Sequence, residues 1–484
     1  MTSSANPQPK SQVDDASAKW VLAVSVLGSS LGFIDSSVVN VALPAIQDDL
    51  SAGLASIQWV ANGYMLTLAS FILLGGALGD RLGTLRAFRI GLTIFVAASV
   101  GCALSFSVQS LVAARLIQGA GAALLVPTSL ALISQAYTGE ARGKAIGTWS
   151  AAGGVLMALG PPLGGWMVDH ASWRSIFFIN VPIAALALLL SFKIVRGQAR
   201  DASRRLDIPG SVLAVLALGC MTYGLIELGQ GAMLAGSALL ATSVPLMASF
   251  IYVEARSSAP IMPLRLFRDR NFAGSNALTA ILYGGLGGAI FMLPFVLIKV
   301  HHYSPTEAGA AFLPLSIILG LGSRLAGGVA GKVGRRLPLI VGPTITTVGF
   351  AMLALSAQMP SYWTSYLPGL VLIGIGMTIA IPALTTTVFD SAPDADSGAA
   401  SGINNAFARS GGLLAVAALG IAFGRSDLSS LSEQNLSNAY TVVMWFAALA
   451  AALSAVCAAA TITSETENRP HEAPRKRTPA TPVS

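Results

Sequence analysis

The sequence predicts an all-α membrane protein of fourteen transmembrane helices, arranged as two six-helix bundles with an inserted pair of helices. Composition is the first reason, because 54% of the 484 residues are hydrophobic and 11% are charged, whereas a soluble chain is about a quarter charged. The second reason is a succession of long apolar runs, and the third is a similarity between the two halves of the chain. We therefore expect most of the chain to lie in lipid.

The apolar runs set the number of spans, since a helix needs roughly 20 apolar residues to cross the hydrocarbon core. Segments of this kind lie near residues 20–43, 57–79, 87–107, 109–136, 143–168, 173–194, 208–229, 232–254, 272–299, 305–330, 337–357, 363–388, 398–424 and 438–462. They predict an N-terminal bundle at 19–195, a loop with inserted helices at 196–271 and a C-terminal bundle at 272–463. The polar tails at 1–18 and 464–484 are expected to be disordered.

The loop charges predict the orientation of these helices. Lysine and arginine gather in the loops after the second, fourth, sixth, eighth and tenth expected helices, whereas the loops and ends on the other side hold Arg174, Lys299 and Arg425. Because cytoplasmic loops carry the excess of basic residues, both termini are expected in the cytoplasm. The net charge of +7 is therefore explained by basic residues in loops on one side of the membrane, and no nucleic-acid partner is expected.

The two halves of the chain share short segments in the same order. "GALGDRLG" (Gly76–Gly83) corresponds to "GGVAGKVG" (Gly327–Gly334), "GAGAALLVP" (Gly119–Pro127) to "GIGMTIAIP" (Gly374–Pro382), and "GKAIG" (Gly143–Gly147) to "GAASG" (Gly398–Gly402). Each match is weak alone, but the offset between the partners is nearly constant. Duplicated helical bundles are the architecture of secondary transporters, which bind their substrate near the midplane between the repeats.

Four motifs in the first bundle resemble those of one transporter family. They are "IDSSVVNVALPAI" with Asp35, Asn40 and Pro44; "GALGDRLGTLR" with Gly76, Asp80, Arg81 and Gly83, where Thr84 and Leu85 replace the usual basic pair; "RLIQGAGAA" with Arg115, Gln118, Gly119 and Gly121; and "GPPLGG" at Gly160–Gly165, preceded by Leu156 where glycine is frequent. The chain resembles the fourteen-helix drug:proton antiporter-2 branch of the major facilitator superfamily, which includes methylenomycin A resistance proteins. The resemblance covers nearly everything between the tails. It implies the major facilitator fold, a place in the bacterial cytoplasmic (inner) membrane and proton-driven export.

Asp35 is the candidate for proton coupling, because an ionisable residue inside the membrane is costly and is a functional candidate by default. Arg115 lies at a similar depth in the same bundle, since at 1.5 Å per residue both are about 10 Å from one membrane boundary. We expect the two to be partners. The alternatives are a structural hydrogen bond for Asp35 and an Arg115 side chain that reaches the surface. Glu227, near the end of the seventh helix, is either a further coupling residue or a wetted interfacial carboxylate.

Neutral polar residues and helix-breaking residues complete the expected site. The substrate cavity is assigned to Asn40, Asn62, Gln118, Asn276, Tyr283, Asn404 and Asn405, and conformational gating to Asp80, Arg81, Gly83, Gly160, Pro161, Gly164 and Gly165. A cavity lined by amides favours neutral or monocationic lipophilic substrates over dicationic ones. Prolines distort a helix and glycines let another helix approach, which suits a pivot or a seal; simple helix packing is the alternative.

The function expected is export of small, largely hydrophobic drugs or antibiotics in exchange for protons. The alternatives are a proton-coupled importer of a small metabolite and a membrane sensor that moves no solute. A membrane enzyme is disfavoured because the four histidines lie in loops or a tail and no phosphate-binding "GxxxxGK[ST]" occurs. We expect no cofactor, no metal and no catalytic residue, and a monomer whose partners are the substrate, protons and the bilayer.

Overall fold

The computed structural model describes residues 15–194, 206–322, 334–359, 361–393, 396–423 and 433–463. Nearly all of these residues are helical. The first half contains α1 (Asp15–Asp49), α2 (Leu54–Leu82), α3 (Thr84–Ala103), α4 (Val108–Ala136), α5 (Gly139–His170), α6 (Ser175–Phe178) and α7 (Asn180–Ser191). The pair α8 (Ile208–Gly229) and α9 (Met233–Arg256) and the short η1 (Leu264–Arg268) follow. The second half contains α10 (Arg270–Lys299), α11 (Pro305–Ala310), α13 (Arg336–Leu355), η2 (Tyr362–Tyr366), α14 (Leu367–Asp390), α15 (Ser397–Phe423) and α16 (Glu433–Thr461).

The described residues confirm the predicted all-helical membrane fold. Thirteen helices are long and apolar enough to span a membrane, and a shorter apolar segment at Ser175–Ser191 completes the fourteen expected crossings. That segment was expected as one helix, but it breaks at Ile179 between α6 and α7. Pro182, in the first turn of α7, explains the break because it has no amide hydrogen to donate to the preceding turn.

Two predicted features lie partly or wholly outside the described residues. Residues 15–18 of the predicted N-terminal tail form the first turn of α1, whereas the rest of that tail and the tail at 464–484 are not described. The segment 327–333 of the second-half repeat and much of the basic loop at 196–205 are also not described.

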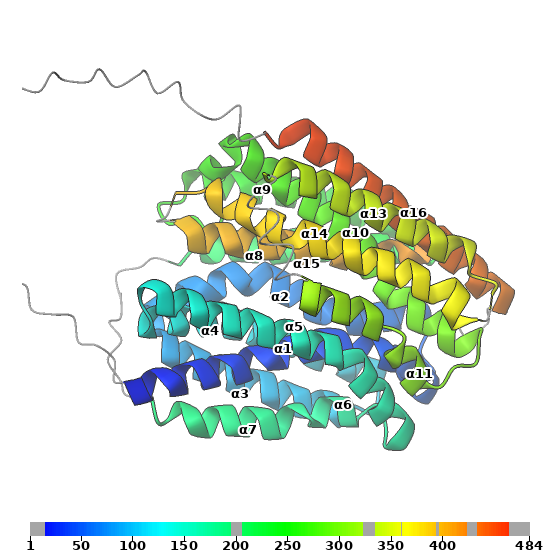
Figure 1. Cartoon of the computed structure of the whole chain (residues 1–484), viewed down its shortest axis with the longest axis horizontal. Coiled ribbons are helices and arrows are strands. Elements are labelled where there is room, and N and C mark those ends of the chain that lie inside the picture. The colour runs from blue at the N-terminus through cyan, green and yellow to red at the C-terminus, as the bar shows by residue number, and fades with distance from the viewer. Residues whose placement is uncertain are drawn as a thin grey trace, which may run out of the picture.

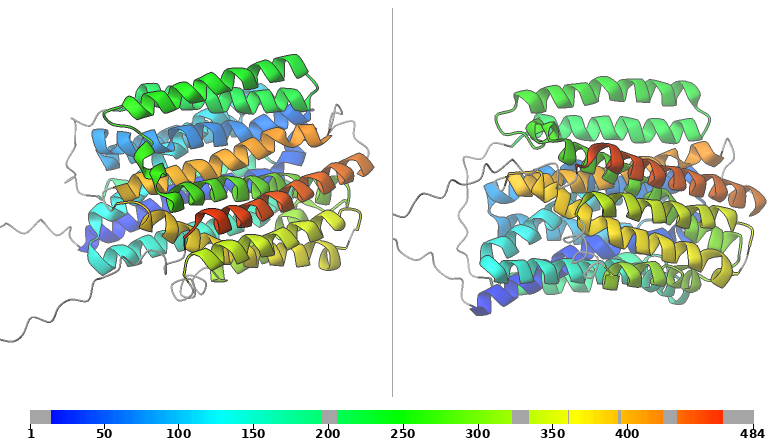
Figure 2. Two further views of the ribbon diagram at one scale, coloured as in Figure 1. Left: turned by 90° about the horizontal axis from the view of Figure 1, so that it is seen from above. Right: turned by 45° about the horizontal axis from the view of Figure 1, so that its top comes forward.

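The helices pack as two bundles with a hairpin beside them. In one bundle α4 packs against α2 and α3, and α1 packs against α5; in the other α10 packs against α15 and α16, and α13 packs against α14 (Figure 1). Helix α8 packs against α9, and it also contacts α2 and α15, the helices at which the two bundles meet. Figure 2 shows the α8–α9 hairpin as an additional layer over this junction.

The bundles also meet at the face where α1 ends, which we call the far face; the face where α1 begins is the N-terminal face. At the far face α5 packs against α11 of the other bundle. The N-terminal half of α5 differs, because residues such as Arg142, Lys144 and Val155 are exposed. Gly153 in this half packs against Phe33 of α1, in its own bundle. Helix α5 therefore meets the second bundle through its far-face turns.

Candidate functional site

Asp35 lies at the centre of a hydrogen-bonded group between α1 and α4. It is 0% exposed, and its Oδ2 atom lies 2.5 Å from an Nη atom of Arg115, which is 2% exposed. Gln118, one turn after Arg115, donates from Nε2 to the other carboxylate oxygen of Asp35 at 2.9 Å and accepts from Arg115 at 2.8 Å. The pairing expected from the equal depth of Asp35 and Arg115 is confirmed, and Arg115 does not extend to the surface.

The guanidinium of Arg115 is held on its remaining sides by α2. Its Nε donates to the carbonyl oxygen of Val60 at 3.1 Å, and its Cζ lies 4.4 Å from the centre of the Tyr64 ring. The hydroxyl of Tyr64 donates to the carbonyl of Gly32 on α1 at 3.4 Å. Because arginine keeps its proton in proteins, the charge at this position is fixed, and Asp35 is the member of the pair that can change charge.

A chain of neutral polar groups continues from Gln118 into the bundle. Nε2 of Gln118 lies 3.3 Å from Oγ of Ser99, which also accepts from Nδ2 of Asn180 at 2.9 Å. Ser99 in turn donates to the carbonyl of Phe177 at 2.9 Å. The carboxylate is thus tied to α3, α6 and α7 as well as to α4. Sequence reasoning missed Ser99 and Asn180, because a polar residue in an apolar helix reveals its depth but not the direction in which it points.

Three other residues predicted for the first bundle and the hairpin lie apart from this group. Asn62 is fully buried, and neither polar atom of its amide has a hydrogen-bond partner in the described part of the chain. Asn40 is half-buried and donates to Ser36 in its own helix at 3.2 Å. Glu227 is half-buried near the end of α8, where it hydrogen-bonds to Tyr223 on the same helix.

The predicted polar residues of the second bundle divide into two kinds. Nδ2 of Asn404 donates to Oγ1 of Thr279 at 2.8 Å and lies 3.3 Å from Oδ1 of Asn276, so these residues tie α15 to α10. Asn405 is exposed and bonds to Ser401 of its own helix, and Tyr283 is half-buried. Asn405 and Tyr283 are therefore available to a ligand, whereas Asn404 and Asn276 are engaged with each other.

The helix-5 motif lies where the two bundles touch. Gly160 and Gly164 pack against Ser37 and Val38 of α1, so closely that a Cβ atom at either glycine would collide with them. Gly165 packs in the same way against the carbonyl of Pro305 in α11. Pro161 and Pro162 remain within α5, which runs unbroken from Gly139 to His170. The motif therefore contacts helix 1 on one side and the second bundle on the other.

Two polar links accompany this contact at the far face. The backbone amide of Thr306 donates to Oδ2 of Asp169 at 2.8 Å, and Nζ of Lys299 lies 2.5 Å from Asp48. Both links cross between the bundles. The exposed lysine pair contributes little, since surface ion pairs are worth about 0–1 kcal/mol.

The predicted gating residues of the loop after helix 2 lie at the N-terminal face. Gly83 has φ 90°, which explains the glycine between α2 and α3, because other residues rarely adopt a positive φ. Asp80 is half-buried in the last turn of α2, and Arg81 is exposed. Their role as a latch stays a prediction.

Arg409 lies within α15 and is half-buried. The ion pairs of the described residues include none between Arg409 and Asp390. In the sequence, the signal that singles out Arg409 is an arginine within the apolar run of α15.

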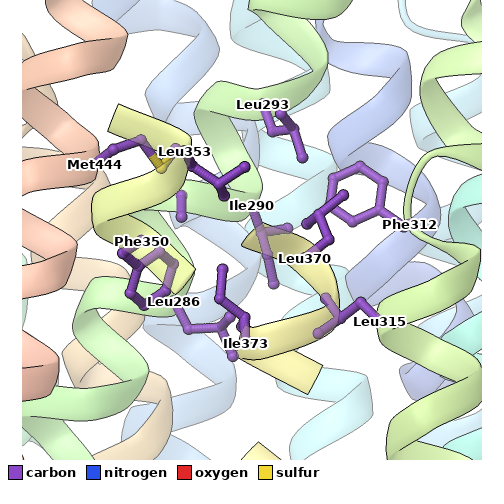
Figure 3. Close-up of a pocket in the computed structure, with 11 residues that line it drawn as sticks. Leu286, Ile290, Leu293, Phe312, Leu315, Phe350, Leu353, Leu370, Ile373 and Met444 are labelled. Carbon is purple, nitrogen blue, oxygen red and sulfur yellow. The ribbon is translucent and has the colours of Figure 1, made fainter. Parts of the chain in front are cut away.

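A small pocket in the second bundle is a poor candidate for the site. It is lined by apolar side chains, among them Leu286, Ile290, Phe350 and Ile373 (Figure 3). Such a lining offers no hydrogen bond to orient a ligand, so we interpret it as a gap in packing between α10, α13 and α14.

Comparison with known proteins identifies the family. Residues 25–416 match the family model of the Major Facilitator Superfamily. The chain belongs to this superfamily. It is therefore an integral membrane protein of a transporter family, as the motifs predicted.

This major facilitator is similar to named resistance proteins. It is 35% identical over 421 residues to the Multidrug resistance protein Stp of Mycobacterium tuberculosis (strain CDC 1551 / Oshkosh), covering 86% of this chain and 78% of Stp. It is 34% identical over 406 residues to the Methylenomycin A resistance protein of Bacillus subtilis (strain 168), covering 83% of this chain and 86% of that protein. Among solved structures, it is similar to an inward-facing, unoccupied bacterial homologue of the lysosomal transporter Spinster, with a TM-score of 0.65 and 17% identity over 93% of this chain and 98% of that one. That last likeness concerns the fold alone.

Proposed function

We propose that this protein is a proton-driven antiporter that exports small, largely hydrophobic drugs or antibiotics by alternating access. The observation that carries the proposal is the buried Asp35–Arg115 pair, since Asp35 is an ionisable group that the fold keeps out of water and next to a fixed cation. The printed names of the similar resistance proteins support the substrate class.

A proton on Asp35 would change the group around it. A carboxylate accepts from both Arg115 and Gln118, whereas a protonated carboxyl group has no charge and carries an O–H donor in place of one acceptor site. Protonation therefore weakens the attachment of α1 to α4. Binding a proton at Asp35 thus favours a different position of α1.

Helix 1 also provides a route from the proton site to the seal. Ser37 and Val38 lie two and three residues after Asp35 on α1, and they are the residues that pack against Gly160 and Gly164 of α5. The next turn of α5 packs against α11 of the other bundle at Gly165. A movement of α1 on protonation is thereby passed to the contact that closes the far face.

The orientation belongs to the same proposal. With the basic loops in the cytoplasm, the N-terminal face is cytoplasmic, the far face is external, and the described conformation is closed to the outside. A cysteine at Ala171, exposed at the far face, is then labelled by an impermeant maleimide in intact cells. A cysteine at Arg142, at the opposite end of α5, requires permeabilised cells, and the reverse pattern would contradict the orientation.

Replacement of Asp35 tests the coupling. In inverted vesicles, a transported drug should trigger proton movement with the wild type and not with Asp35→Asn, because the amide does not titrate. Asp49→Asn is the matched control, since Asp49 lies on the same helix in a half-exposed pair with Arg174. Proton movement at the wild-type rate in Asp35→Asn would exclude Asp35 as the coupling residue, and the absence of any solute movement in the wild type would favour a sensor.

A further inference from the structure

Arg409 is an arginine at the middle of a transmembrane helix. It lies twelve residues after Ser397 and fourteen before Phe423, the two ends of α15, which places it about 18 Å and 21 Å from them. A charged arginine at this depth is energetically costly, and arginine cannot lose its proton there. The charge is therefore a permanent feature of the membrane interior.

No acidic side chain neutralises this charge in the described residues. Arg115 has Asp35 at 2.5 Å, and the other described arginine ion pairs, those of Arg174 and Arg265, are at least a third exposed. Arg409 is half-buried and makes none of them. The charges of Asp35 and Arg115 cancel when both residues are ionised. Arg409 therefore leaves an excess positive charge near the midplane.

The groups around Arg409 come from both bundles. Gly412, in the turn after Arg409 on α15, lies near the backbone carbonyl of Tyr283 on α10 and near the sulfur of Met65 on α2. Asn405, one turn before Arg409, is exposed, and α15 packs against both α2 and α10. Arg409 thus lies at the junction of the bundles, where major facilitators that move by alternating access bind substrate.

We propose that Arg409 binds an anionic group of the transported compound, a carboxylate or a comparable ionised acid, with Tyr283 and Asn405 as neutral hydrogen-bonding neighbours. The guanidinium presents its donors in a planar fork that matches a carboxylate. This substrate class rests on the proposed export function and differs from the neutral or singly cationic compounds expected from the amide-rich lining alone.

Tyr64 connects this binding position to the proton site. One face of its ring lies against Arg115, and the next residue, Met65, lies near Gly412 in the turn after Arg409. An anion bound at Arg409 would therefore lie on the side of the bundle junction that α2 shares with the Asp35–Arg115 pair. The negative charge of the bound anion would repel the negative charge of an ionised Asp35. Binding of the substrate and binding of the proton would thereby be linked in one site.

Equilibrium binding of three matched probes tests the inference. 2-Naphthoate, 2-naphthamide and 2-naphthylmethylammonium have similar size and differ in charge. With the full-length protein in nanodiscs, the anion should bind about tenfold or more tightly than the amide, which is the gain expected of one charge-assisted hydrogen bond. Arg409→Gln should abolish the difference between anion and amide, and Arg409→Lys should retain part of it, because lysine keeps the charge and loses the fork.

Arg256→Gln is the matched control for bulk charge. Arg256 is an exposed arginine that lies over Tyr252 on α9, away from the bundle junction, so its loss should leave the preference for the anion intact. Should Arg409→Gln bind neither probe, Arg409→Lys decides the question. Equal wild-type affinity for acid and amide, no binding of either, the same preference in Arg409→Gln, or tightest binding of the ammonium probe would each overturn the proposal.

Binding measurements distinguish a failure of this inference from a failure of the proposed function. A protein that prefers the anion through Arg409 but moves no protons would contradict antiport and leave the binding position standing. A protein that exchanges protons for neutral compounds, with no preference for the anion, would do the reverse.

Discussion

Gly309 of α11 packs against the backbone carbonyl of Pro161 in α5, so closely that the two bundles could not meet there if Gly309 carried a side chain. The contact is reciprocal, since Gly165 of α5 packs against the carbonyl of Pro305. The seal at the far face is therefore made of backbone against backbone.

Gly309→Ala should weaken this seal. Its new methyl group would overlap the Pro161 carbonyl, which belongs to a helix and cannot move aside alone, so the far-face ends of α5 and α11 should separate. Spin labels at Ala171 and Met359, one on each bundle, should report a longer distance after replacement of the native cysteines. Gly320→Ala is the control, because Gly320 belongs to the same apolar span, Pro305–Gly322, and no described residue lies within 4 Å of a Cβ atom there. An unchanged distance distribution in Gly309→Ala would mean that the contact does not hold the far face closed.

The buried pair should respond to mutation as a unit. Arg115→Met or Asp35→Asn alone leaves the other group without its partner, and breaking a buried pair typically costs about 3–5 kcal/mol. The double variant removes both groups, so its melting temperature should exceed that of either single variant. Asp49→Asn and Arg174→Met, taken from a half-exposed pair, should each change stability by less than about 1 kcal/mol. Additive losses in the buried double variant would show that the two residues do not interact energetically.

Replacing Asn404 should lower stability, whereas replacing its neighbour Asn405 should weaken binding. Asn404→Ala removes hydrogen bonds between α15 and α10, each worth about 0.6–1 kcal/mol in a membrane bundle, so the melting temperature should fall. Asn405→Ala removes only a bond within its own helix and should leave melting unchanged while weakening 2-naphthoate binding. Equal melting temperatures for the two variants would contradict this division.

His301 should make stability depend on pH at the far face. Partial burial lowers the pKa of its imidazole below the ordinary 6.5, and its Nε2 atom lies 2.7 Å from the hydroxyl of Tyr366. The folded protein therefore holds the neutral form more strongly than the unfolded chain does. Stability contributed by the neutral form is present above pH 6.5 and is lost as the pH falls through the lower, folded pKa.

The measurement is the melting temperature of the purified protein at pH 8 and pH 5. The fall in wild type should be larger than in His301→Gln, which has no imidazole to protonate. His302→Gln is the control, because His302 is 74% exposed and contacts only Glu433 in the described salt bridges. A fall of the same size in all three proteins would assign the pH effect to other groups.

Helix number and depth follow from the sequence, whereas the direction of a side chain does not. The pairing of Asp35 with Arg115 was predictable because helical rise fixes the depth of both, and lipid leaves a buried charge few other partners. Asn404 was expected in the cavity but faces α10, because depth alone does not distinguish the two sides of α15. The break at Ile179 follows from Pro182, whose local effect was present in the sequence but masked by the apolar run around it.

The α8–α9 hairpin makes the two flanks of the protein unequal. Helix α8 lies across the line where α2 meets α15, with Gly229 packed against Gly420, so this junction is shielded by an extra pair of helices. The other described junction, between α5 and α11, has no such cover in the described chain. A hydrophobic compound already dissolved in the bilayer would therefore meet an extra pair of helices at the α2–α15 flank, which restricts lateral access from lipid on that side.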